Sequence, residues 1–274
     1  MRLAAAGNVL KTWLIVGILC GAAGGLGWLL AGQRGATLFA FCSLLAALGV
    51  YAYGDRALLG MLGARPYALA EDPLLKSTVD RLAAGFHITA PKIYLLDDLF
   101  PRSLAVGRGP RSSSVAVSTG LLGALPPDEL TGVLAHELAH VRSRDVLTQT
   151  FAVLLAVMLV ETSRIGGWFS NALLYVYAPL GAALVHLTLS PKRELNADRL
   201  AATVTQAPDE LADALIRLDR ASELVSFAAS PATSPLYPVD PFDDSRLTRM
   251  FRTHPPLEAR LAQLRASQGP APGV

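Results

Sequence analysis

Five consecutive residues, His136-Glu137-Leu138-Ala139-His140, have the types and spacing of a metal-dependent hydrolase. Residues four positions apart lie on one face of an α-helix, so the two imidazoles can bind one metal ion together. Glu137 follows the first histidine and can act as general base on a metal-bound water. The pattern also arises by chance, so it requires a helix, a third ligand and supporting residues from the rest of the chain.

A second cluster, from Glu194 to Asp198, contains the most plausible third ligand. Glu194 and Asp198 are four positions apart, and Pro191 suits the first turn of a helix that would carry both. Two histidines and one carboxylate bind Zn²⁺ and leave a fourth position for water, so we predict Glu194 as a ligand and one Zn²⁺ per subunit. Asp198 would then hydrogen-bond the outer nitrogen of a ligand histidine. Without the upstream motif, both acids would be interpreted as a solvated helix face.

The elements that must position these residues can be predicted from the same sequence. Pro126-Pro127-Asp128-Glu129 favours the start of a helix that carries the histidines to about Arg144. Further helices are expected at 74–84, ending at Gly85, and at 209–227 and 257–267. Short strands are expected at 91–96, 103–106 and 113–118, with a turn at 107–110. One strand could be a sheet edge beside the active helix, where an extended peptide adds as a further strand; ordinary sheet core is the alternative.

The composition favours membrane segments: 52% of residues are hydrophobic and 17% are charged, against about 25% charged in a soluble domain. Apolar runs at 13–31 and 36–53 have about the length that a bilayer requires, so residues 1–54 are predicted to form a transmembrane hairpin. Gly17, Gly21 and Gly25 either let its helices approach closely or reflect the glycine content of membrane helices. A cleaved signal peptide at 1–31 is the alternative. Lys and Arg residues are enriched on the cytoplasmic side of membrane proteins. Their distribution in this chain predicts that the N-terminus and everything after Tyr53 lie in the cytoplasm.

A second hydrophobic stretch at 146–189 interrupts the remaining domain, residues 55–274. We predict a second transmembrane hairpin there. The alternative for its first half, which contains Thr148 and Gln149, is a buried helix continuous with the active helix. The net charge of +2, with no basic aromatic stripe and no phosphate-binding glycine loop, argues against a nucleic-acid partner.

The polar segment Arg252-Thr253-His254-Pro255-Pro256 remains unexplained by the elements above. Peptide hydrolysis needs a donor for the developing oxyanion besides the metal. His254 is our candidate for this catalytic role, and Arg252 is the second candidate. A loop histidine that fixes the turn before Pro255 is the alternative. His87 and His186 are interpreted as structural.

In this order, these motifs resemble the HtpX-like membrane zinc metalloproteases, a family that includes the eukaryotic CAAX prenyl proteases. The resemblance extends over most of the chain, including Ser118-Thr119-Gly120-Leu121-Leu122 before the active helix. It implies an α+β fold: a mainly helical, zincin-like domain with a small sheet, plus transmembrane hairpins. It also implies His136, His140 and Glu194 as zinc ligands and Glu137 as the base. One position departs from the family, since Arg102 stands where an Asn is usual.

By this resemblance, the protein is a multi-pass protease of the bacterial inner membrane. Its active site would face the cytoplasm and cleave misfolded or damaged membrane proteins. Three rivals remain: an inactive scaffold or chaperone that keeps zinc for folding, a CAAX-type prenyl protease, and a soluble secreted peptidase with residues 1–31 as its signal. The intact Glu137 argues against the first, and four spans in 274 residues argue against the second.

Overall fold

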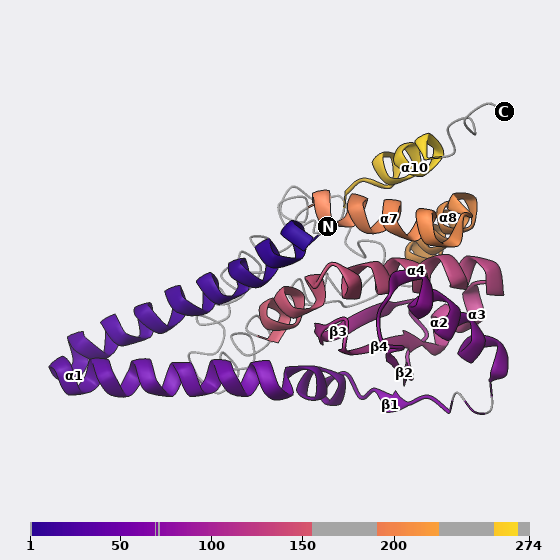
Figure 1. The fold of residues 1–274 in the computed structure, drawn as a ribbon. Coiled ribbons are helices and arrows are strands. Elements are labelled where there is room, and N and C mark those ends of the chain that lie inside the picture. The colour runs from indigo at the N-terminus through magenta and orange to yellow at the C-terminus, as the bar shows by residue number, and fades with distance from the viewer. Residues whose placement is uncertain (1, 69, 71, 155–190, 225–254, 268–274) are drawn as a thin grey trace.

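A long helical hairpin precedes a small sheet, which is covered by helices (Figure 1). The computed structural model describes residues 2–68, 70, 72–154, 191–224 and 255–267. The described elements in chain order are α1 (Arg2–Met61), β1 (Arg65–Pro66), α2 (Pro73–Phe86), β2 (Lys92–Leu96), β3 (Ser103–Gly109), β4 (Ser112–Ser118), α3 (Thr119–Ala124), α4 (Pro127–Arg142), the short helix Asp145–Leu154, α7 (Pro191–Thr205), α8 (Pro208–Leu224) and α10 (Leu257–Ala266). The predicted combination of many helices with a small sheet is confirmed.

Helix α1 reverses direction at Ala31 and Gly32, so its two halves form the arms of a hairpin. Gly32 has φ of +61°, a left-handed value that glycine adopts without strain. Close to this turn, Gly27 and Gly35 lie backbone against backbone, and a Cβ atom on either would collide with the carbonyl of the other. The predicted hairpin geometry is therefore present, with its tightest contact beside the turn.

The glycines singled out from the sequence do not make that contact. Gly17, Gly21 and Gly25 have no neighbouring atom within 4 Å of a Cβ placed on them. Of the two interpretations of these three glycines, close approach of the helices is therefore not supported, because the glycine contact between the arms lies near the turn. Their presence instead fits the general glycine content of such helices.

The sheet has the strand order β1-β2-β4-β3, so β3 is an edge strand. β2 and β4 are parallel, whereas β3 and β4 form an antiparallel pair with Ser103 opposite Val117. β3 extends to Gly109, beyond the predicted 103–106, and the chain turns only at Pro110 and Arg111. The edge strand packs beside α4, the helix of the histidine motif.

Alternate residues of the strands face two separate cores, as the two-residue period of a strand requires. Ala105, Val115 and Val117 pack with α2, α4, α7 and α8. Leu104 and Ala116 pack on the opposite face against the end of α1 and the helix Asp145–Leu154. The sheet therefore separates the site-bearing helices from the hairpin.

The prediction for α2 placed its start one residue late, at 74 instead of Pro73, and its end two residues early, at 84 instead of Phe86. The helix begins after the cap Asp72, whose side chain accepts a hydrogen bond from the N–H of Leu75. It continues through Gly85 to Phe86. His87, with φ of +54°, then ends the helix by donating its backbone N–H to Ala83 and Ala84, which agrees with its structural interpretation.

The first part of the predicted insert is a short helix, Asp145–Leu154, separated from α4 by a turn at Ser143 and Arg144. It is buried against α1, where Thr148 hydrogen-bonds Thr12 (2.7 Å) and Phe151 packs with Val16. It is therefore buried, as the alternative held, but is not continuous with α4. Residues 155–189, including His186, lie outside the described residues, and the second membrane hairpin stays a prediction.

Candidate metal centre and active site

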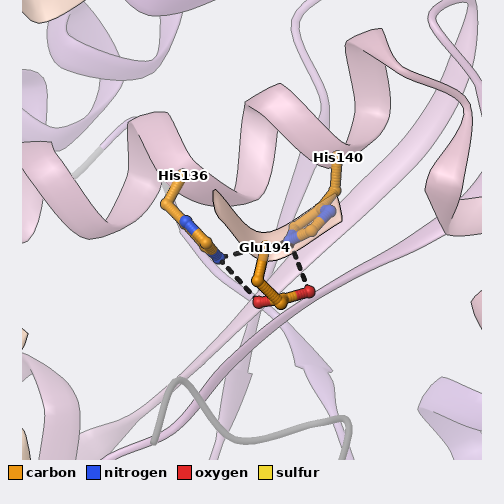
Figure 2. A group of neighbouring side chains, drawn as sticks. All are labelled: His136, His140 and Glu194. Atoms are coloured by element: carbon orange, nitrogen blue, oxygen red, sulfur yellow. Dashed lines mark hydrogen bonds and ion pairs between the residues drawn. The ribbon is translucent and has the colours of Figure 1, made fainter. Parts of the chain in front are cut away.

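The histidines of α4 and Glu194 of α7 converge on one point (Figure 2). The Nε2 atoms of His136 and His140 are 3.2 Å apart. Each lies 3.5 Å from one carboxylate oxygen of Glu194. The three residues are only 4–6% exposed, although each carries a polar or charged group that is costly to bury without a partner.

A metal ion fits these three residues. Zinc bonds of about 2.0–2.1 Å in a tetrahedral site place ligand atoms roughly 3.3–3.4 Å apart, close to the spacings observed. Two imidazoles and one carboxylate are a donor set that Zn²⁺ favours, and other divalent metals also accept it. The structure thus brings together the three predicted ligands in a site suited to a divalent metal.

Asp198 lies on α7 one turn beyond Glu194, where the sequence predicted a partner for a ligand histidine. Its Oδ1 is 2.8 Å from Nδ1 of His136. Arg260 of α10 donates to both carboxylate oxygens of Asp198, with Nη2 to Oδ1 at 2.6 Å and Nε to Oδ2 at 2.8 Å. This arrangement fixes the His136 ring and leaves Nε2 facing the metal position.

Sequence reasoning missed Arg260. It lies on the same helix face as Leu257 and Leu264, both of which contact the core. An arginine on an apolar stripe is the signal that could have found it, because a buried cation needs an anionic partner.

His140 has a matching arrangement that was also missed. Its Nδ1 lies 3.3 Å from Oδ2 of Asp145, the first residue after the turn that ends α4. Arg193, just before Glu194, reaches Oδ1 of Asp145 at 2.8 Å. Each histidine is therefore oriented by a carboxylate, and each carboxylate is paired with an arginine.

The pKa values of the metal-free site reflect these pairs. Burial lowers the pKa of both histidines, but the neighbouring carboxylates raise it by more. Asp198 and Glu194 leave the pKa of His136 above its ordinary value. Glu194 and Asp145 raise the pKa of His140 to about 10. Burial raises the pKa of Asp198, yet Arg260 holds it well below the ordinary value. Asp198 is therefore a carboxylate at neutral pH and accepts a hydrogen bond from Nδ1–H of His136.

Glu137 is 6% exposed and accepts a hydrogen bond from the Ser103 hydroxyl at 2.7 Å from its Oε1. Ser103 is the first residue of the edge strand β3. The sheet edge expected beside the active helix is thus present, and it touches the predicted base directly. Nothing in the sequence near Ser103 signals this contact across 34 positions.

Arg102, at the usual Asn position, does not contact the metal ligands among its described interactions. Its Nη2 lies 2.8 Å from Oδ2 of Asp98. Its backbone N–H donates to Oγ of Ser118, and its carbonyl accepts from the N–H of Ser118. These contacts fix the entry into β3, immediately before Ser103.

Two predicted residues cannot be located. His254 and Arg252 lie outside the described residues. Pro255 follows this segment directly, and Pro256 is the N-cap of α10, which carries Arg260. The segment predicted to supply an oxyanion donor therefore leads directly into a helix that contacts the site.

Hydrolysis of a peptide bond by a metal-activated water needs a metal, a base and a place for an extended chain. A helix that carries two ligands and a glutamate, with a sheet edge in contact with that glutamate, suits metal-dependent endopeptidases. The comparisons with known proteins agree: a family model, Peptidase family M48, matches residues 69–268. The chain belongs to this family, and it is a metalloendopeptidase.

Several relatives share most of their length with this chain. A Protease HtpX homolog from Acidiphilium cryptum is 36% identical over 275 residues, which cover 94% of this chain and 96% of the relative. Another from Salinibacter ruber is 38% identical over 251 residues, covering 88% and 91%. A third, from Pyrococcus abyssi, is 34% identical, covering 93% and 94%. The family resemblance of the motifs is therefore confirmed.

A solved structure supports the fold. The crystal structure of Ste24p from S. mikatae superimposes with a TM-score of 0.50 at 19% sequence identity. The match covers 93% of this chain and 67% of the other. At this identity, the likeness concerns the fold alone.

Proposed function

We propose that the protein is a membrane-embedded zinc endopeptidase that cleaves misfolded or damaged membrane proteins at the cytoplasmic face. The observation that carries this proposal is the convergence of His136, His140 and Glu194 beside Glu137. The relatives named as HtpX proteases support proteolysis by similarity, whereas the substrate class rests on the resemblance of the motifs.

In this proposal His136, His140 and Glu194 hold the ion. Zinc held there would lower the pKa of a water towards about 7 and would polarise the scissile carbonyl. Glu137 takes the proton of the attacking water and passes it to the leaving amine. Ser103 fixes Oε1 of Glu137, so the second oxygen is available for that proton. Asp198 and Asp145 keep the two imidazoles in their binding orientation.

The substrate chain would bind along β3. This strand has β4 on one side, and no other described strand pairs with its outer edge. An extended peptide can hydrogen-bond such an edge by strand addition. Because Ser103 contacts Glu137, a peptide at this end of β3 would bring its backbone next to the base.

His254 is proposed as the donor for the oxyanion, with Arg252 as the second candidate. The proximity of α10 to the site, through Arg260 and Asp198, supports this assignment. Replacing His254 with Gln would reduce kcat while leaving zinc content unchanged; a histidine that only fixes a turn would affect stability instead.

The hairpin surface supports a membrane position. Residues 12–61 of α1, which include parts of both arms of the hairpin, are apolar and long enough to cross a membrane, and only 11% of their most apolar stretch is buried. Large apolar side chains such as Ile18, Leu29 and Phe41 are exposed. In water, such a surface is unfavourable, whereas lipid tails would cover it. Carbonate washing of membranes should leave the full chain in the membrane fraction, and release of the chain would remove this part of the proposal.

The activity is tested with casein, a loosely folded substrate, and purified full-length protein. Wild type with zinc should cleave casein, and Glu137→Gln should retain zinc but lose nearly all activity, because general-base catalysis typically contributes 10²–10⁴-fold. Equal cleavage by both proteins would reject Glu137 as the base. Zinc binding without cleavage by wild type would favour the inactive scaffold. A prenylated peptide cleaved far faster than casein would favour the CAAX-type enzyme.

A further inference from the structure

A cavity of about 210 Å³ lies where the second arm of α1 meets the sheet, away from the metal centre. Residues of the last turns of α1, the start of β2 and the turn between β3 and β4 line it. It is far larger than the space that a single water occupies. Its lining is polar and strongly basic.

Four cationic side chains surround the cavity: Arg56, Lys92, Arg108 and Arg111. Asp55 is the single carboxylate in the lining. None of the five forms an ion pair within the described part of the chain. Four positive charges around one space repel one another, so an anion in the cavity would relieve that repulsion.

Hydroxyl groups complete the lining. Ser112, Ser113 and Ser114 lie side by side at the start of β4. Oγ of Ser113 is buried without a hydrogen-bond partner in the described structure. Buried hydroxyls normally have a hydrogen-bond partner, and an anionic oxygen next to Ser113 would accept a hydrogen bond from its hydroxyl.

The cavity lies at the boundary of the apolar hairpin. The rings of Trp13 and Tyr51, one from each arm, are 5.6 Å apart, and Arg108 lies over the Tyr51 ring at 5.9 Å. Residues 13–31 and 33–51 each measure about 28 Å as helices, close to the hydrocarbon thickness of a bilayer. Aromatic side chains at this level are typical of the headgroup region, and Asp55 and Arg56 follow immediately.

We propose that this cavity binds a phosphate group, supplied by the headgroup of an anionic phospholipid. Basic pockets beside membrane helices on the cytoplasmic side recognise such headgroups. The guanidinium groups of Arg56, Arg108 and Arg111 suit the phosphate oxygens because arginine donates in pairs. The choice of a lipid over a soluble phosphate rests on the proposed membrane position of α1. The phosphate site itself rests on the lining of the cavity and is independent of that position.

The site would fix the active centre relative to the membrane surface. β3 begins at Ser103, which binds Glu137, and its far end carries Arg108 at the cavity. Six strand steps separate Ser103 from Gly109, or about 20 Å. A lipid phosphate bound at one end of β3 therefore holds the base at a set height above the bilayer.

The test compares two triple variants of the full chain in a zwitterionic detergent. The cavity variant is Arg56→Gln, Lys92→Gln, Arg111→Gln, which keeps the Arg108–Tyr51 contact. The control variant is Arg81→Gln, Arg199→Gln, Arg220→Gln, which removes the same charge from exposed positions on α2, α7 and α8. Thermal unfolding is followed during titration with dihexanoyl phosphatidylglycerol, dihexanoyl phosphatidylcholine or inorganic phosphate at constant ionic strength.

Phosphatidylglycerol should raise the unfolding temperature of wild type and of the control, and phosphatidylcholine should raise it much less. The cavity variant should need on the order of tenfold or more phosphatidylglycerol for the same rise in unfolding temperature. Stabilisation by inorganic phosphate with the same loss in the cavity variant would keep the phosphate site but assign it a soluble ligand. Equal responses of both variants, or no response of wild type, would overturn the proposal. Casein cleavage and carbonate extraction, measured in parallel, report separately on the protease and on the membrane position.

Discussion

Arg260 binds Asp198 through two hydrogen bonds, of 2.6 and 2.8 Å, and the pair is almost completely buried beneath His136. The two residues are 62 positions apart and join α10 to α7. Asp198 in turn lies 2.8 Å from Nδ1 of His136. The last described helix is therefore a structural part of the metal centre, although it supplies no ligand.

Replacing Arg260 with Ala should weaken both folding and metal binding. Asp198 would remain buried without its cation, and loss of one partner of a buried pair costs about 3–5 kcal/mol. Zinc affinity should fall roughly 10–100-fold because His136 loses its orientation. Chemical denaturation and competitive zinc titration measure the two effects. Arg265→Ala, on the exposed side of α10, is the control, and an Arg260→Ala protein that matches it would contradict the role of the pair.

Asp145→Asn should weaken zinc binding without a change of ligand. The substitution removes the negative charge that orients Nδ1 of His140. It also removes the negative charge that Arg193 contacts at Asp145. The expected loss of zinc affinity is again about 10–100-fold. Asp97→Asn, at an exposed position, should bind zinc as wild type does. Undiminished affinity in Asp145→Asn would show that the contact does not orient the ligand.

Ser103→Ala should lower kcat while zinc content stays constant. The hydroxyl donates to Glu137, and a hydrogen bond to a charged group contributes about 1.5–3 kcal/mol, so a fall of roughly 10–100-fold is expected. Ser103→Thr keeps the hydroxyl and should recover most of the rate. If Ala and Thr variants were equally slow, the defect would lie in the packing of β3.

Zinc affinity should rise with pH across the neutral range. Without metal, Glu194 and Asp145 raise the pKa of His140 to about 10, so this imidazole holds a proton at neutral pH, and the carboxylates beside His136 raise its pKa as well. Zinc must displace the proton of any protonated imidazole that it binds. For each proton released, the apparent zinc affinity rises about tenfold per pH unit, until the pH exceeds the pKa of the imidazole that releases it. Calorimetric titration in two buffers of different ionisation enthalpy counts the protons. Zinc binding with no proton release at pH 7 would contradict this account.

The two histidines were predictable because their geometry is local, whereas Glu194 was predicted because two histidines need a third ligand of the right type. His136 and His140 are four positions apart on a helix with a clear start, and Glu194 is four positions from Asp198 on another. Helical periodicity alone therefore fixes which of these side chains share a face. The strands near the site could also be predicted from short apolar runs, with errors only at their ends.

The supporting contacts were not predictable to the same degree. Ser103 meets Glu137 across 34 positions, and Arg260 meets Asp198 across 62, so only the tertiary fold brings them together. The buried Arg260 on an apolar stripe left a signal in the sequence, whereas Ser103 left none. The hairpin contact at Gly27 and Gly35 depends on where the turn falls, which the glycine spacing did not indicate.

The central claim is that His136, His140 and Glu194 hold the metal that activates this peptidase, and metal analysis of Glu194→Ala tests it most directly. Wild type and the exposed-site control Glu258→Ala should each purify with about one zinc per chain. Glu194→Ala should lose most of its zinc and its casein cleavage together. Full zinc content in Glu194→Ala would remove this residue from the ligand set and contradict the account.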